Sequence, residues 1–249
     1  MSLLEARGVT RAFGSLVAIN DVSFAVEPGE LRAVIGPNGA GKTTFFNLIS
    51  GLFPPTNGSI FFDGRDITRL SANKRVSLGI TRTFQVTEIF PELTVSENLR
   101  IAVESAAGLR MSPWTSRATR QQVADRVVEL LAAGGLIGKG QRLVGELSHG
   151  DQRATEIMMA LALKPRLLLL DEPTAGMGEQ ETRDVVRLIS KLHKDERLTI
   201  VLIEHDMRVI FHLADRITVL AEGAVLADGA PDAIAANERV QAAYLGSAH

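Results

Sequence analysis

A glycine-rich run near the N-terminus has the composition of a phosphate-binding loop. Its spacing is G-x-x-x-x-G-K-[ST], and it consists of Gly36, Pro37, Asn38, Gly39, Ala40, Gly41, Lys42 and Thr43. Glycines let the backbone wrap closely around phosphates with its N–H groups pointing inward, and the helix that follows adds partial positive charge. We expect Lys42 to reach the β- and γ-phosphates of a nucleotide, Thr43 to bind Mg²⁺ through its hydroxyl, and Thr44 to add to the nucleotide site.

Two adjacent carboxylates, Asp171 and Glu172, end the apolar run Leu167–Leu170. After a phosphate-binding loop, the first carboxylate of such a pair binds Mg²⁺ directly or through water. The second can polarise a water molecule that attacks a phosphate. On its own, a leucine run that ends in Asp-Glu is common where a strand leaves a core, so the interpretation depends on the loop upstream.

The surrounding residues predict the elements that must position these groups. Val22, Phe24 and Val26 alternate with smaller residues, and Leu31–Ile35 leads into the glycine-rich loop, so the first part of the chain is predicted to form strands. A helix carrying Thr44–Ile49 follows the loop. The other predicted strands are Ser59–Phe62, Leu167–Leu170, Thr199–Ile203 and Ile217–Leu220.

The second half of the chain alternates strands with helices, which is typical of an α/β core with a parallel sheet. Its strands are continuous apolar runs of the kind that parallel sheets bury on both faces. Between about residues 88 and 160 the spacing is helical instead, with Val123, Val127, Leu130 and Leu131 on one side of a helix. We therefore predict a single domain, residues 1–249, with a helical subdomain inserted at about 88–160.

Composition narrows the range of functions. The chain has 249 residues, a formal net charge of −2 and no cysteine. The near-neutral charge argues against a nucleic-acid partner, and the missing cysteines exclude disulfides, thiolate nucleophiles and zinc–thiolate sites. No apolar run approaches the ~20 residues that a membrane-spanning helix needs, and no signal peptide is recognisable, so we expect any membrane role to come through a partner.

A third motif links the first two to a known family. Leu147–Gln152 reads Leu-Ser-His-Gly-Asp-Gln and opens an expected helix, for which Ser148 is also a good N-cap. The glycine-rich loop, this Leu-Ser-x-Gly segment, the strand with Asp171 and Glu172 and a later histidine resemble, in this order, the ATP-binding cassette (ABC) family. The resemblance covers nearly the whole chain and implies a P-loop NTPase fold, an α/β ABC ATPase core with an N-terminal antiparallel β portion and an inserted helical subdomain. It departs from the commonest motifs at His149 and Asp151, and Ala175–Gly178 lacks the usual aspartate of the D-loop.

The resemblance implies roles for further residues. In the family, the signature of one subunit closes over the γ-phosphate held by another, which implies that Ser148 and Gly150 bind nucleotide. Gln85 resembles the glutamine that contacts Mg²⁺ or water and senses the membrane partner. His205 resembles the switch histidine at the γ-phosphate, and Phe13 the aromatic that stacks on adenine. Glu172, His205, Gln85 and Lys42 are thus the expected catalytic residues, and Thr43, Gln85 and Asp171 the expected metal ligands.

Several sequence segments resemble one branch of the family, the ATPases of branched-chain (hydrophobic) amino-acid importers. These segments are Phe45–Gly51, Gly79–Gln85, Gly150–Arg153, Ile203–Met207 and Ala243–Gly246. Urea and short-chain amide importers share much of the sequence of these segments and stay open as an alternative. So does a non-transport ABC ATPase, although such chains usually carry two cassettes, a coiled coil or a zinc insert. A module that holds nucleotide without turnover is a third alternative.

The resemblance also implies cofactors, partners and a location. We expect ATP and Mg²⁺ as cofactors, and a second ABC ATPase subunit, a copy or a paralogue, as the partner that completes each site. Transmembrane permease subunits would bind the chain, and an extracytoplasmic solute-binding protein would act indirectly, with no nucleic acid involved. The expected place is the cytoplasmic face of the inner (plasma) membrane, where the permease holds the chain peripherally.

Overall fold

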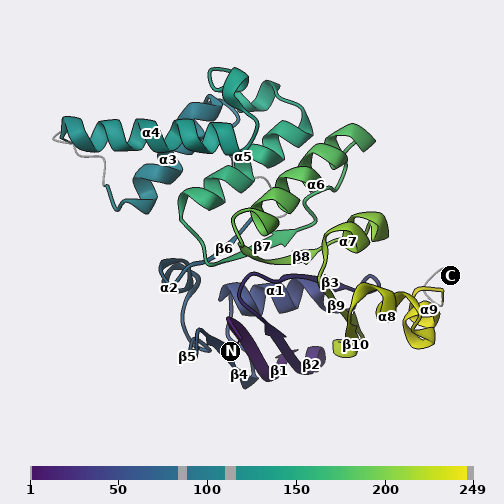
Figure 1. Cartoon of the computed structure of the whole chain (residues 1–249). Helices are drawn as coiled ribbons and strands as arrows, with labels where there is room; N and C mark the ends of the chain where they lie inside the picture. Colours follow the sequence, from purple (N-terminus) through teal and green to yellow (C-terminus); the bar gives the residue numbers. More distant parts are fainter. Residues whose placement is uncertain (1, 84–88, 110–115, 246–249) are drawn as a thin grey trace.

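The computed structural model describes residues 2–83, 89–109 and 116–245, and its strands form two sheets (Figure 1). The smaller sheet is antiparallel in the order β2-β1-β4-β5, as expected for the N-terminal part. Its strands are β1 (Leu4–Phe13), β2 (Leu16–Val26), β4 (Asn57–Phe62) and β5 (Arg65–Asp66).

The larger sheet has the order β10-β9-β3-β8-β7-β6, and only its edge pair β9–β10 is antiparallel. The predicted strands of the second half are confirmed and lie side by side with the strand before the glycine-rich loop. The strands are β3 (Leu31–Ile35), β6 (Ile80–Arg82), β7 (Leu167–Asp171), β8 (Thr199–Ile203), β9 (Arg216–Ala221) and β10 (Ala224–Gly229).

The larger sheet is buried on both faces because its strands are apolar at successive positions. In β7, Leu168 and Leu170 pack into one hydrophobic core, whereas Leu167 and Leu169 pack into another on the opposite face. The second core lies between the two sheets and contains the inner side of α1 (Lys42–Ser50). The larger sheet therefore has a hydrophobic core on each face, and these two cores hold the ends of its strands in place.

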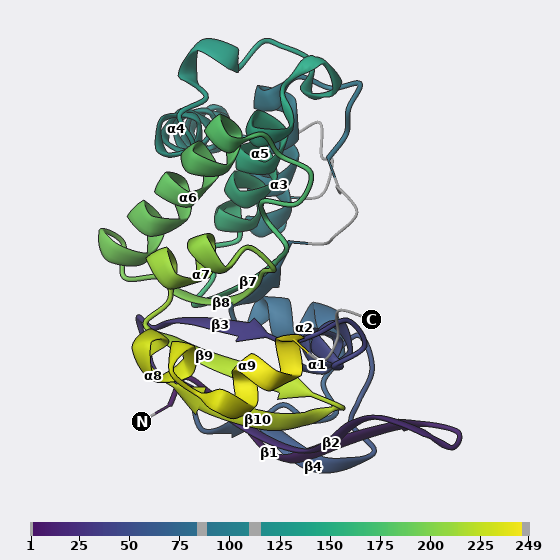
Figure 2. The same ribbon diagram turned by 90° about the vertical axis from the view of Figure 1, so that its right-hand side faces the viewer.

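The first core is closed by helices on the other face of the sheet (Figure 2). The helical segment connects β6 to β7, which are neighbours in the sheet. Its helices and those that follow are α3 (Val95–Ala106), α4 (Arg117–Ala133), α5 (His149–Ala162), α6 (Glu179–Lys194) and α7 (Met207–Leu213), with short 3₁₀ turns at Ile137–Lys139 and Val144–Glu146. The remaining helices are α2 (Ala72–Ser77), which precedes β6, and α8 (Pro231–Ala235) and α9 (Glu238–Leu245) near the C-terminus.

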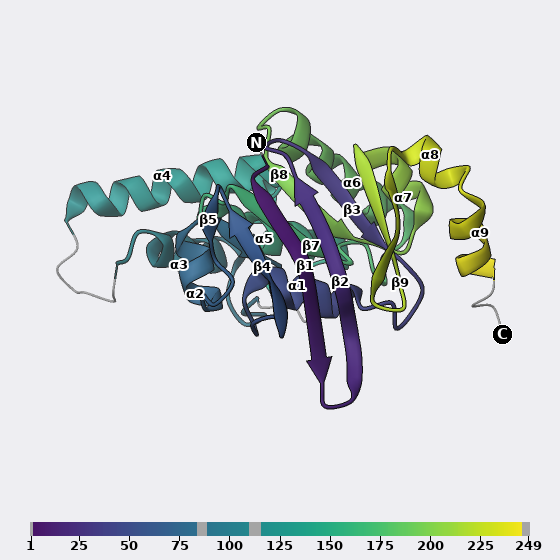
Figure 3. The ribbon, with the colours of Figure 1, turned by 90° about the horizontal axis from the view of Figure 1, so that it is seen from below.

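The carboxyl ends of the parallel strands meet at one edge of the sheet. There β3 passes into the glycine-rich loop, β7 ends at Asp171, and β8 is followed by Glu204 and His205. In Figure 3, which views the molecule from below, strands β1 and β2 of the antiparallel sheet lie in front of the larger sheet. Ligands of open α/β sheets bind at this edge, so the fold gathers the predicted chemical groups where a ligand is expected.

The C-terminal end of α1 is fixed by a buried arginine. Arg75 is fully buried, and burial lowers its pKa to about 10, so it is still charged at neutral pH. Its guanidinium donates only to main-chain carbonyl oxygens, those of Leu48, Ile49, Ile67, Thr68 and Leu70. A cation at this end of a helix also complements the helix dipole. Arg75 thereby joins the helix after the glycine-rich loop to the segment after β5.

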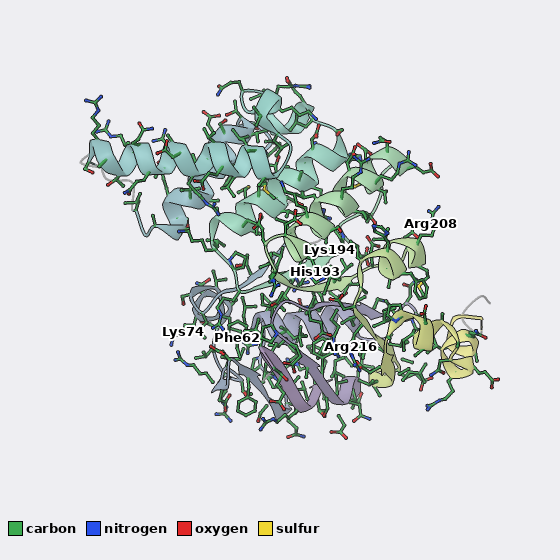
Figure 4. The ribbon with its side chains drawn as sticks, viewed as in Figure 1. Phe62, Lys74, His193, Lys194, Arg208 and Arg216 are labelled. Carbon is green, nitrogen blue, oxygen red and sulfur yellow. The ribbon has the colours of Figure 1, made fainter. Side chains whose placement is uncertain are left out.

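A network of hydrogen bonds connects strands β3, β9 and β10 at one edge of the larger sheet. Asp228 on β10 accepts hydrogen bonds from Arg32 at 2.8 Å, from Arg216 at 2.5 Å and from the Thr218 hydroxyl at 2.6 Å. Arg216, at the start of β9, is labelled in Figure 4.

Within the described residues, no helix has both the length and the apolar character needed to cross a bilayer.

Candidate active site

The glycine-rich loop has the backbone geometry that only glycine allows. Gly41 has φ +96°, and a Cβ atom on it would lie 2.6 Å from the carbonyl oxygen of Ala18. A Cβ on Gly36 would lie 2.1 Å from the Leu220 oxygen, so both positions lie against main chain. Asn38 and Gly39 are exposed at the tip of the loop, and Ala40 is buried beneath it. The loop can therefore present main-chain N–H groups to a ligand from its exposed side.

Lys42 lies inside this loop rather than on the surface. Its Nζ donates hydrogen bonds to the carbonyl oxygens of Gly36 at 2.7 Å and Pro37 at 3.0 Å. Burial lowers the pKa of the ammonium, and the charges of Glu172 and Asp171 oppose that shift. The structure thus brings together Lys42 and both predicted carboxylates. Thr43 is exposed in the first turn of α1, and Thr44 beside it is half-buried.

Asp171 is almost completely buried at the end of β7, where its Oδ2 accepts a hydrogen bond from Nη2 of Arg82 at 2.7 Å. No cluster of three or more His, Cys, Asp or Glu side chains suited to a metal occurs within the part of the chain that the structure describes. Mg²⁺ is usually held by one or two carboxylates, with phosphates and water completing its octahedron. The Asp171 carboxylate fits that ion, provided that a bound nucleotide brings the phosphates.

Glu172 has a strained backbone, as functional residues often do. Its φ is +47°, a left-handed conformation that is uncommon for a residue other than glycine, and its N–H donates to the Ile203 oxygen at 2.9 Å. The turn aims its carboxylate at the loop after β8. There Oε1 shares a hydrogen bond of 2.8 Å with Nε2 of His205. The predicted base and the predicted switch histidine are therefore direct neighbours.

Glu204 fixes the geometry of these two loops. Its carboxylate is 4 % exposed and accepts hydrogen bonds from the N–H of Thr174 at 3.0 Å, from the Thr174 hydroxyl and from the N–H of His205 at 2.7 Å. One carboxylate thus connects the chain after β7 with the chain after β8. Glu204 is not among the residues predicted from the sequence, although its place directly after an apolar run, like that of Asp171, was a usable signal.

The signature residues lie elsewhere, at the start of α5 and against the first turn of α6. Ser148 is the N-cap of α5 and accepts from the N–H of Asp151 at 3.3 Å. The N–H of Gly150 donates to Glu181 at 3.3 Å, and the N–H of Gly178 donates to the same carboxylate at 3.1 Å. These two hydrogen bonds lower the pKa of Glu181. The capping role of Ser148 is confirmed, and Glu181 is a contact that the sequence did not reveal.

Phe13 and Gln85 are the remaining predicted residues. The Phe13 ring is 44 % exposed at the end of β1, and it meets Phe53 edge to face with 5.5 Å between ring centroids. The Arg11 guanidinium lies 4.5 Å from the Phe13 centroid. Gln85 lies outside the described residues.

Comparisons with known proteins decide the family. The family model described as ABC transporter matches residues 19–175, which contain the loop, the signature segment and the Asp171–Glu172 pair. The chain belongs to the ABC transporter family. A second model, described as branched-chain amino acid ATP-binding cassette transporter, matches residues 224–249 of this ABC cassette.

Two curated relatives match this ABC cassette over nearly their whole length. It is 41 % identical to the high-affinity branched-chain amino acid transport ATP-binding protein BraF of Pseudomonas aeruginosa, over 99 % of this chain and 98 % of BraF. It is 39 % identical, with the same coverage, to LivG of Escherichia coli K12, which has the same description. Among solved structures, the ADP conformation of MJ1267, an ATP-binding cassette of an ABC transporter, has a TM-score of 0.87 and 26 % identity, covering 99 % of this chain and all of that one.

Proposed function

We propose that this ABC ATPase powers the uptake of branched-chain or related hydrophobic amino acids. The end-to-end match to BraF and LivG, together with the branched-chain model over residues 224–249, is the observation that carries the substrate class. Solute contacts are expected in the permease and the binding protein, because this chain supplies energy rather than a solute pocket. A urea or short-chain amide importer is the competing assignment.

The reaction that fits the site is in-line attack of water on the γ-phosphate of ATP. Lys42 and the main-chain N–H groups of the loop would hold the phosphates, and Thr43 and Asp171, with Gln85, would hold Mg²⁺, which stabilises the developing negative charge. Glu172 would accept a proton from the attacking water. His205 would keep the Glu172 carboxylate in position through their 2.8 Å hydrogen bond.

Each complete site would need a second cassette. Ser148 and Gly150 lie at the start of α5, away from their own glycine-rich loop, and would close over a nucleotide held by the partner. Adenine would stack on Phe13. The partner ATPase is a copy of this chain or a paralogue, and the closed pair would reopen after hydrolysis.

A permease would bind at a groove between β6, α3 and α5. The groove has a volume of about 300 Å³, and its lining includes Thr81, Thr83, Phe90, Ile101 and Met159. Phe90 in this lining directly follows Ile89, which packs against the helical core. Docking there would hold the chain at the cytoplasmic face of the inner membrane, with a solute-binding protein acting on the far side.

Transport in a strain that lacks this subunit tests the proposal. Uptake of radiolabelled leucine, isoleucine and valine should fall and should return when the wild-type subunit, but not Glu172→Gln, is supplied. Urea uptake measured in parallel is the control. Unchanged amino-acid uptake with lost urea uptake would reassign the solute, whereas no transport defect at all would contradict the importer assignment.

A further inference from the structure

Arg82, which is not among the predicted nucleotide-site residues, contacts the carboxylate proposed to bind Mg²⁺. Its side chain is 6 % exposed and that of Asp171 is 1 % exposed, with 2.7 Å between Nη2 and Oδ2. We infer that Arg82 is a positioning residue, which holds one oxygen of Asp171 so that the other is presented to the metal ion. This inference rests on the proposed nucleotide site.

The backbone places the two side chains on the same face of the sheet. β6 and β7 are parallel neighbours, and Arg82 is paired with Leu169, two residues before Asp171. Paired residues of neighbouring strands, and residues two apart in one strand, point to the same side. The N–H of Thr83 donates to the Leu169 oxygen at 3.0 Å, which fixes this register up to the end of β6. The contact is therefore set by the strand pairing.

The rest of the guanidinium is held by the helix that follows the glycine-rich loop. Nη1 of Arg82 donates to Asn47 Oδ1 and lies 3.5 Å from the hydroxyl of Ser50, both on α1. The guanidinium also lies 5.7 Å from the centroid of the Phe46 ring. Because α1 carries Thr43 in its first turn, Arg82 connects the two elements that supply the proposed metal ligands.

The planar guanidinium of an arginine suits the positioning of Asp171 better than the ammonium of a lysine would. One nitrogen can hold a carboxylate oxygen while another holds the side chain of Asn47, in fixed directions. Without Arg82, Asp171 could rotate or turn toward Lys42, whose pKa already reflects the charge of Asp171. Groups that orient a metal ligand in this way typically change metal affinity without contacting the ion.

The test measures metal dependence of nucleotide binding rather than turnover. Binding of a fluorescent ATP analogue to the full chain is followed in EDTA and at increasing Mg²⁺ for wild type, Arg82→Gln and Arg82→Lys. Arg166→Gln, which removes an arginine from the exposed ion pair with Asp63, is the matched control. Thermal unfolding of each variant reports whether the fold is intact.

We expect Arg82→Gln to raise the Mg²⁺ concentration for half-maximal binding about tenfold, with binding in EDTA within about twofold of wild type. Arg82→Lys should recover only part of the loss, and the control should match wild type. An unchanged Mg²⁺ dependence in Arg82→Gln would overturn the inference, as would an equal loss of binding with and without Mg²⁺. Absence of nucleotide binding in the wild-type chain would instead contradict the proposed function.

A second set of variants, made in the Asp171→Asn protein, distinguishes positioning of Asp171 from a general effect of the Arg82 charge. In Asp171→Asn, the further change Arg82→Gln should not alter the Mg²⁺ dependence, because the carboxylate that it positions is already gone. An additional tenfold effect in the double variant would show that Arg82 acts on the metal by another route and would also overturn the inference.

Discussion

Nε2 of His205 lies 2.8 Å from Oε1 of Glu172, although the two residues follow different strands of the sheet. His205 is 46 % exposed and Glu172 is 22 % exposed, so water can reach the pair. The φ of +47° at Glu172 and the hydrogen bonds of Glu204 to both loops keep this geometry. A carboxylate held beside the glycine-rich loop and open to water is what a general base for phosphoryl transfer requires.

Glu172→Gln should therefore bind ATP but hydrolyse it about 10²–10⁴-fold more slowly. The substitution preserves size and removes the charge and most of the basicity, whereas Lys42, Thr43 and the loop amides that are proposed to hold the nucleotide stay intact. Phosphate release measures the rate, and light scattering with and without ATP, in the presence of the natural partner, measures whether an ATP-bridged dimer accumulates. Hydrolysis near the wild-type rate would show that Glu172 is not the base.

His205→Ala should also slow hydrolysis, because Glu172 loses the neighbour that holds its carboxylate. If His205 acts only through Glu172, the double variant with Glu172→Gln should hydrolyse no more slowly than Glu172→Gln alone. A further loss in the double variant would mean that the histidine acts on the phosphate independently.

Lys42→Ala should weaken ATP binding by about 3–5 kcal/mol, since it removes a largely buried charge that would otherwise contact the phosphates. Nucleotide affinity measured by fluorescence and the ATPase rate both check this. Lys164→Ala, a lysine beyond the end of α5, is the control and should leave both unchanged. A Lys42→Ala protein with more than half of the wild-type ATPase rate would contradict the assignment of the glycine-rich loop.

Single cysteines near the proposed permease groove should crosslink to a membrane subunit. The chain contains no cysteine, so Ile89→Cys and Ile101→Cys introduce the only thiols. Ile137→Cys, on a 3₁₀ turn with 69 % of the side chain exposed, is the control. Crosslinks should form at the first two sites in a transport-competent complex, and crosslinking at Ile137 alone would place the interface elsewhere.

Asp228→Asn should destabilise the fold at neutral pH by about 1–3 kcal/mol, because Arg32 and Arg216 lose their charged acceptor. Burial alone would raise the pKa of Asp228, but the hydrogen bonds from Thr218 and Arg216 and the nearby positive charges outweigh it, so the pKa is lowered. The stabilisation is therefore present above the unfolded pKa of about 4 and is lost as the pH falls through the folded value. Urea unfolding should show a full difference at pH 7 that narrows below about pH 4. A difference that does not depend on pH would contradict this assignment.

Arg75→Met should lower the free energy of unfolding by about 3 kcal/mol, because several buried carbonyl groups lose their donor and each loss is costly. Arg69→Met, which removes an exposed arginine from the same segment, is the matched control and should change little. Equal stability of the two variants in urea unfolding would show that the carbonyl groups find other partners.

The sequence predicted the elements whose signal is local. Apolar runs such as Leu167–Leu170 predicted buried strands of an α/β core, and the family comparison confirms the ABC fold expected from the loop and the signature segment. The parallel order of the strands places Lys42, Asp171 and Glu172 together, as their motifs require. Their roles in ATP hydrolysis, and the subdomain at 88–160, remain predictions.

The sequence did not reveal contacts between side chains and groups that are distant along the chain. Arg75 and Arg82 both donate several hydrogen bonds inside the protein, yet each stands among polar residues and looks like an ordinary surface arginine. Glu181 is similar, because its bond to Gly150 depends on how α5 packs against α6. Such contacts follow from tertiary packing, which no local periodicity encodes.

The connection between β6 and β7 has a consequence for the order of folding. The two strands pair directly, yet residues 83–166 lie between them. Closing an unstructured loop of that length costs about 4 kcal/mol in chain entropy, and the three-residue strand β6 offers few hydrogen bonds in return. We expect the helices of this segment to form first and bring its ends together, since that shortens the closure. The contact between Arg82 and Asp171 would then be among the last to form, which makes completion of the proposed metal-binding edge a late event in folding.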